Sequence, residues 1–310
     1  MAVPATSIPD RKYYDDESGV DALQEAGTIQ WFPGHMARTR RKIKESLSLV
    51  DVTVEILDAR IPRSSRNPEL NDLLGDKPRV VILNKADIAD ETATAAWMDV
   101  CRADGYAALA VDCKSGKGIN AFLPLLRRVL ADKLAVWESK GMGGRPIRAM
   151  VVGIPNSGKS SFINRMARGG KAKVEDRPGV TRENQWFVVD AGAQLLDTPG
   201  ILWPKFEDQT VARHLAYTGA IRDEILDREE LASGLLTILG REYAPLLCER
   251  YKLPGELPED GWELLQLIGR RRGMLISGGE VDTERAAITV LDEFRGGKLG
   301  RITLEKPEEA

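Results

Sequence analysis

A glycine-rich segment, GIPNSGKS at residues 153–160, has the spacing of a loop that wraps around phosphate groups. Glycines in such a loop let backbone N–H groups face phosphate oxygens, and the helix that follows adds a favourable potential for anions at its first turn. We expect the Lys159 ammonium to reach the β- and γ-phosphates of a nucleotide, and the Ser160 hydroxyl to ligate Mg²⁺. Further contacts to the nucleotide are expected from Asn156, Ser157, Gly158 and Ser161.

Two later segments suit a site that senses a third phosphate. The segment DTPG, which runs from Asp197 to Gly200, follows a short apolar run. The Asp197 carboxylate can hold Mg²⁺, and the N–H of Gly200 can contact the γ-phosphate. Between this segment and the phosphate loop, the segment RPGVTR contains Thr181. A threonine in such a loop can ligate Mg²⁺ only when the γ-phosphate is present, so Thr181 is predicted to be a nucleotide contact, a metal ligand and, with Lys159, a catalytic residue.

The segment NKAD, which carries Asn84, Lys85 and Asp87, predicts which base is bound. A carboxylate can accept hydrogen bonds from both N1–H and the N2 amino group of guanine, whereas adenine offers no such pair of donors. Asn84 can tie the loops together near the base, and the Lys85 stem can lie along the ring. Backbone N–H groups at Cys113 and Lys114 can face guanine O6. By itself NKAD also suits an ordinary turn at a strand end, but with a phosphate loop on the same sheet it indicates GTP or GDP. Unusually, it precedes that loop.

The elements that must position these residues alternate between apolar runs and helical stretches. Such alternation predicts a mostly parallel α/β sheet, doubly wound, with helices on both faces, as in P-loop NTPases. Strands are expected at 52–57, 80–83, 107–111, 147–152, 184–189 and 194–196, and helices at 36–49, 90–103, 119–136 and from 159.

Beyond Trp203 the pattern is helical only, with helices expected at 209–219, 227–248, 260–270 and 282–294. The sequence therefore predicts a C-terminal all-α domain. The predicted organisation is an acidic flexible tail at 1–28, a nucleotide domain at 29–204, a helical domain at 205–300 and a C-terminal tail at 301–310.

Composition limits the class of protein. The formal net charge of the 310 residues is −3, so a nucleic acid would have to be bound through local basic patches. Two such patches occur, and an ordinary solvated face remains the alternative for each. The three cysteines lack metal-ligand spacing, which favours a reducing cytoplasm, and no apolar run or leader indicates a membrane. The two patches are Arg38–Lys44 and Arg270–Arg272 with Lys298 and Arg301.

The motifs, in this order, resemble the circularly permuted GTPases, and in particular the ribosome biogenesis GTPase A (YlqF) family. The resemblance includes WFPGHM at residues 31–36, DARIPRSSRN at 58–67, NKAD, the phosphate loop, DTPG, and LISGG at 275–279. It implies that residues 29–204 are a circularly permuted GTPase domain. It further implies that the protein is a factor in late maturation of the large ribosomal subunit and that this factor contacts the subunit precursor and its rRNA. The protein is expected to be a monomer. The chemistry of DAR and of the arginines at 63–66 stays unassigned.

Hydrolysis needs a group that positions water. Many GTPases use a glutamine soon after DxxG, but here Ile201 and Leu202 follow, and apolar side chains cannot do this. The resemblance implies that His35 positions water and that Asn156 coordinates K⁺, which would offset charge that develops between the phosphates. A loop histidine that only packs is the alternative for His35. His214, on a predicted helix, is expected to be structural.

Two other functions remain open on these residues. One is a GTP-dependent binding module in which hydrolysis is incidental, which the apolar Ile201 favours mildly. The other is a GTPase for a non-ribosomal partner such as a tRNA-modification complex. Independently of these alternatives, the nucleotide switch is predicted to act on the helical domain through the short link at Trp203 and Pro204.

Overall fold

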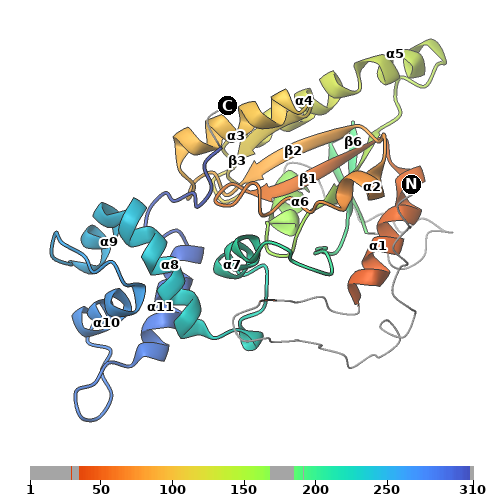
Figure 1. Cartoon of the computed structure of the whole chain (residues 1–310). Coiled ribbons are helices and arrows are strands. Elements are labelled where there is room, and N and C mark those ends of the chain that lie inside the picture. The colour runs from red at the N-terminus through yellow and green to blue at the C-terminus, as the bar shows by residue number, and fades with distance from the viewer. Residues whose placement is uncertain (1–28, 30–34, 168–184, 191, 308–310) are drawn as a thin grey trace, which may run out of the picture.

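The computed structural model describes residue 29 and residues 35–167, 185–190 and 192–307. Within these residues one six-stranded sheet has the order β3-β2-β1-β4-β6-β5 (Figure 1). All neighbouring strands are parallel except β5, which pairs antiparallel with β6 at the edge. The predicted doubly wound α/β sheet is confirmed. Its strands are β1 (Val52–Asp58), β2 (Arg79–Asn84), β3 (Ala107–Val111), β4 (Ile147–Val152), β5 (Trp186–Asp190) and β6 (Ala193–Asp197).

Strand β1 lies at the centre of the sheet and is buried along its whole length. Alternate side chains point to opposite faces, so Val54 and Ile56 pack with helices on one face and Leu57 packs with helices on the other. The first face is covered by α4 (Phe122–Val129) and α6 (Lys159–Ala167). The second is covered by α1 (His35–Ser46), α2 (Leu70–Leu74) and α3 (Glu91–Ala103).

The register of the sheet brings the carboxyl ends of three strands to one edge. Asp58, which ends β1, lies opposite Asn84, which ends β2. Strand β4 pairs with the other side of β1 and leads directly into the phosphate loop. Ligand sites of parallel sheets lie at this edge, so residues far apart in the sequence can share one site.

Helices α7 to α11 lie beside the carboxyl edge of the sheet, with α8 to α11 clustered at the lower left of Figure 1. Aspartates cap the N-termini of α7, α8, α10 and α11, where their side chains accept hydrogen bonds from backbone N–H groups of the first turn. The bounds are α7 (Gln209–Tyr217), α8 (Arg228–Glu242), α9 (Ala244–Tyr251), α10 (Gly261–Arg271) and α11 (Thr283–Arg295).

Two long helices expected from the sequence are each divided in two. The stretch 227–248 breaks at Tyr243, because Pro245 lies in the first turn of α9 and has no N–H with which to continue α8. The stretch 119–136 begins as a short 3-10 helix and is interrupted at Leu130 (φ −103°, ψ 16°), between α4 and α5 (Ala131–Ser139). Leu130 is buried in the core that covers the first face of the sheet.

One hydrophobic core extends from the sheet into the helical cluster. It contains Met150 and Leu196 of the sheet together with Leu235 and Val290 of the helices. The connecting segment fills the space between them: Ile201 and Leu202 are fully buried, and the rings of Trp203 and Phe206 pack edge to face with centroids 5.1 Å apart. The link that was predicted to transmit the nucleotide state is therefore part of this shared core.

Residues 301–307, which we call the C-terminal strap, lie against the first part of the chain. Leu304 N donates to Arg60 O at 2.8 Å, and Thr303 Oγ1 donates to Ala59 O at 3.2 Å. The Glu305 carboxylate accepts from the backbone N–H of Arg63 and contacts Nδ1 of the buried His214 at 2.9 Å. The histidine is thus structural, as expected.

None of the helices in the described part of the chain combines the length and the apolar character that crossing a bilayer requires.

Candidate guanine-nucleotide site

The phosphate loop has backbone geometry that only certain residues adopt easily. Gly158 has a φ of 95° and Asn156 has a φ of 58°. Both values lie in the left-handed region, which glycine adopts most easily and asparagine more easily than most other residues. The Lys159 side chain is buried, and its Nζ donates to Ile154 O at 2.8 Å. Burial lowers the pKa of Lys159 to about 8, although the Asp197 carboxylate acts in the opposite direction. A buried ammonium whose environment contains one carboxylate is well placed to gain from additional phosphate charge.

Replacing Gly158 with alanine is expected to disrupt the site. An added Cβ would lie 2.1 Å from Asn84 Nδ2, and the alanine backbone would have to adopt a φ of 95°. Strain of this kind costs about 1–3 kcal/mol, so urea unfolding should show at least that loss of stability. Displacing Asn84 should also weaken GDP binding, measured by calorimetry.

The matched control is Gly144→Ala, because nothing lies within 4 Å of a Cβ at that position and its φ is not positive. Equal stability of the two variants would contradict the proposed close approach between Gly158 and Asn84.

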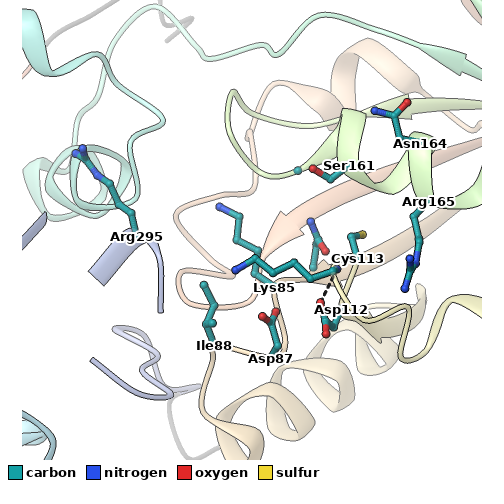
Figure 2. Close-up of a pocket in the computed structure, with 12 residues that line it drawn as sticks. Lys85, Asp87, Ile88, Asp112, Cys113, Ser161, Asn164, Arg165 and Arg295 are labelled. Atoms are coloured by element: carbon teal, nitrogen blue, oxygen red, sulfur yellow. Dashed lines mark hydrogen bonds between the residues drawn. The ribbon is translucent and has the colours of Figure 1, made fainter. Parts of the chain in front are cut away.

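The NKAD motif lines a pocket of about 320 Å³ that opens beside the phosphate loop. Figure 2 shows Asp87, Asp112 and Cys113 on one side of it, Ser161 and Asn164 of α6 on another, and Arg295 of α11 farther away. Asn84 Nδ2 donates to Ser157 O at 2.9 Å and so ties the base motif to the phosphate loop, as expected. The lining residues are Asn84, Lys85, Asp87, Ile88, Asp112, Cys113, Lys114, Gly158, Ser161, Asn164, Arg165 and Arg295.

The DCKSG segment forms a turn that suits its predicted role. The Asp112 carboxylate accepts from Lys114 N at 2.7 Å and Ser115 N at 3.1 Å. Burial alone would raise the pKa of Asp112, but these hydrogen bonds lower it below its usual value. The turn places Cys113 and Lys114 on the pocket wall, on which a base would lie. Burial raises the pKa of the Cys113 thiol to about 12, so this cysteine is a packing group and not a nucleophile.

The edge expected to hold Mg²⁺ contains a buried carboxylate oxygen that lacks a partner. Asp197 Oδ1 has no hydrogen-bond partner among the described residues, and burial raises the pKa of Asp197 against the effect of Lys159. Ser160, at the start of α6, is exposed. A buried carboxylate oxygen without a partner and a serine hydroxyl at the start of the helix after the phosphate loop are donor types that suit Mg²⁺. The residues present therefore fit the ion.

Gly200 lies directly against the phosphate loop. A Cβ there would approach Pro155 N to 2.7 Å, and Ile201 N donates to Gly153 O at 3.1 Å. The DTPG segment is thus held against the phosphate loop, and its role toward a γ-phosphate stays a prediction. Thr181 lies outside the described residues, as does the side chain of His35, whose backbone begins α1. Both roles stay predictions.

Asn156 and Lys85 have contacts that the sequence did not indicate. The Asn156 amide donates to Gly219 O, beyond the end of α7, so its predicted role toward K⁺ stays a prediction. Lys85 Nζ donates to Asn156 O at 2.7 Å and to Asp58 Oδ2 at 2.8 Å. The motifs alone indicate no role for Asp58. Its position at the carboxyl end of the central strand, next to β2, is the sequence signal that could have indicated one.

The fold and this arrangement define a P-loop GTPase: a phosphate loop after one parallel strand, a guanine motif after another, and a carboxylate for Mg²⁺ after a third. Residues 148–239 match the family model described as 50S ribosome-binding GTPase. That match starts at β4, so the guanine motif lies before it, which is the circularly permuted order. The chain belongs to the ribosome biogenesis GTPase A family.

Three relatives illustrate the similarity. The ribosome biogenesis GTPase A of Bacillus cereus is 47% identical over 281 residues, which cover 91% of this chain and 95% of that protein. The GDP-bound structure of T. maritima YlqF is 30% identical, with a TM-score of 0.63, and the match covers 87% of this chain and 100% of that one. The GNP-bound structure of the same protein has 27% identity, a TM-score of 0.59 and coverage of 88% and 100%.

Proposed function

We propose that this GTPase is an assembly factor that binds the precursor of the large ribosomal subunit late in its maturation and hydrolyses GTP there. The observation that carries the proposal is the phosphate loop joined to the guanine motif at the edge of a permuted sheet, in a chain 47% identical to a protein named for ribosome biogenesis. The description of the matching family model, a 50S ribosome-binding GTPase, supports the large subunit as the partner.

The chain's own groups would act on GTP by position and charge. Lys159 would balance the β- and γ-phosphate charge, Gly200 would donate its N–H to the γ-phosphate, and Asp87 would hold the base. Ser160, Asp197 and Thr181 would hold Mg²⁺, which supplies positive charge between the phosphates. His35 would position the attacking water, and Asn156 would coordinate K⁺, since Ile201 and Leu202 are fully buried in the core and have no polar group.

The proposed RNA-binding surface consists of the two basic patches. On α1, Arg38, Arg41 and Lys44 are exposed. In the second patch, Arg272 pairs with Glu293 and Arg301 pairs with Glu91, so part of its charge is already balanced. Arg270, Arg271 and Lys298 are exposed and are the stronger candidates for phosphate contacts. Binding through such contacts should weaken steeply with salt.

A cytoplasmic monomer is part of the proposal. The three cysteines all lie in the described residues and are free thiols, which suits a reducing compartment.

The test is GTP turnover with and without purified large-subunit precursors, in K⁺ and in Na⁺. We expect stimulation by the precursor, a further gain in K⁺, and loss of the stimulated rate, but not of GTP binding, in His35→Ala. A factor of about 10³ or more is typical when a partner completes a GTPase site. Tight GTP-dependent binding to the precursor without stimulated turnover would instead support a binding module. No binding to the precursor at any salt concentration would refute the ribosomal proposal.

A further inference from the structure

A buried carboxylate connects the guanine motif to the segment that follows β1. Asp58 is fully buried, and its two oxygens accept from Arg60 Nε at 2.9 Å and Arg60 Nη2 at 2.7 Å. The second oxygen also accepts from Lys85 Nζ at 2.8 Å. Burial alone would raise the pKa of Asp58, but the two cations outweigh it and hold that pKa well below the usual range. One ionised carboxylate therefore fixes Lys85 and Arg60 at the same time.

Arg60 also reaches the helical cluster. Its Nη1 donates to Phe294 O at 3.2 Å and to Arg295 O at 3.4 Å, which are carbonyls at the end of α11. Its guanidinium carbon lies 5.1 Å from the centre of the Phe294 ring. The last carbonyls of a helix have no partner within the helix and favour a cation, so Arg60 caps α11 from the other side of the domain boundary. The side chain is 1% exposed, so the carbonyls take the place that water would have beside an exposed guanidinium.

The path returns to the phosphate loop through α7. Arg295, at the end of α11, donates to Ala216 O at 2.9 Å and to Tyr217 O at 3.0 Å, and pairs with Asp223. Gly219, two residues beyond α7, accepts from the amide of Asn156, whose own carbonyl accepts from Lys85. The groups form a closed ring of contacts from Lys85 through Asp58, Arg60, α11 and α7 back to the phosphate loop.

We propose that Asp58 and Arg60 are positioning residues that couple guanine binding at Lys85 to the seating of helix α11 and the C-terminal strap. This inference rests on the guanine-nucleotide site described above and concerns the base, in contrast to the switch at Asp197–Gly200, which would respond to the γ-phosphate. Because coupling between two equilibria is reciprocal, a bound base must stabilise the seated helix as much as the seated helix stabilises the bound base.

The strap offers a direct reporter of that seating. Ile302 N donates to Ile88 O at 3.0 Å, next to the guanine motif, and Leu304 N donates to Arg60 O at 2.8 Å. A Cβ on Gly297, two residues after the end of α11, would lie 2.1 Å from the Ile88 side chain. The segment that follows α11 therefore also packs closely against the residue after the base motif. Release of α11 would expose both strap amides to water.

The first experiment measures amide hydrogen exchange of the wild-type protein with and without saturating GDP. We expect GDP to slow exchange at Ile302 and Leu304 by about tenfold more than at Leu125 and Leu126 of α4, which packs on the other face of the sheet. A GTP analogue should give the same difference, because it carries the same base. Slowing that is uniform over the molecule would reflect global stabilisation only and would overturn the proposal.

The second experiment uses Arg60→Lys, which keeps a positive charge beside Asp58 but cannot reach Asp58 and the α11 carbonyls together. We expect GDP and GTP-analogue affinity to fall by an equal factor of about ten, and the nucleotide dependence of strap exchange to disappear. The matched control is Arg102→Gln, which removes an exposed ion pair with Asp99 on α3, outside the ring of contacts and the strap, and should leave GDP affinity within about twofold.

The outcomes separate this proposal from the proposed function. If wild-type protein bound no guanine nucleotide, the function itself would be wrong. If it bound and hydrolysed GTP while strap exchange stayed independent of nucleotide, only the coupling would be wrong. Should Arg60→Lys fail to fold, the wild-type exchange data decide the question alone.

Discussion

Replacing Lys159 with alanine is expected to lower kcat/KM for GTP by about 10²–10³-fold, the usual cost of removing one preorganised charge-stabilising group. The reason is local: Lys159 is buried at the start of α6, where Ile154 O accepts from its Nζ and the nearby Asp197 carboxylate offsets part of its charge. Phosphate oxygens would supply further partners. The measurement is steady-state GTP hydrolysis, with GTP affinity determined separately.

The control for this variant is Lys140→Ala, which removes an exposed ammonium just after α5 and should leave hydrolysis unchanged. A Lys159→Ala protein with wild-type kcat/KM would show that the loop does not carry the phosphates.

Replacing Asp87 with asparagine is expected to change the base that the protein prefers. The carboxylate can accept from two guanine donors, whereas an amide accepts one and donates one, which suits the carbonyl at position 2 of xanthine. Each hydrogen bond to a charged group contributes about 1.5–3 kcal/mol, so GTP affinity should fall by about 10–100-fold and XTP affinity should rise. Competition of GTP and XTP for the same protein measures this reversal.

Asp76→Asn is the matched control, because that exposed carboxylate precedes β2 and lies at the opposite edge of the sheet from Asp87. If Asp87→Asn weakened GTP and XTP equally, the base would be bound elsewhere, and the assignment of the pocket in Figure 2 to guanine would be wrong.

The nucleotide site could be predicted from the sequence because its contacts are short-range patterns. The phosphate loop needs Gly158 where φ is positive, and the sheet needs buried strands that end at Asp58, Asn84 and Asp197. These requirements appear in consecutive residues. The positions of the strands along the chain then determine which ends meet, because parallel neighbours share an edge.

The ring of contacts around Asp58 could not be predicted in this way. Arg60 donates to Phe294 O across 234 residues, and nothing local distinguishes it from a solvated arginine. The same holds for Glu305, whose partners Ser64 and His214 lie in different parts of the chain. The break between α8 and α9, in contrast, has a local cause, because Pro245 lies in the first turn of α9.

The C-terminal strap has a consequence for how the molecule folds and unfolds. Its contacts close very long loops, 244 residues for Thr303 with Ala59 and 241 for Glu305 with Ser64. Closing such loops costs entropy that is recovered only after both partners have their folded shape, so these contacts should form after the rate-limiting step. Interactions absent from the transition state affect the unfolding rate and leave the folding rate nearly unchanged. The strap therefore determines mainly how long the sheet and the helices stay joined, and much less how quickly they come together.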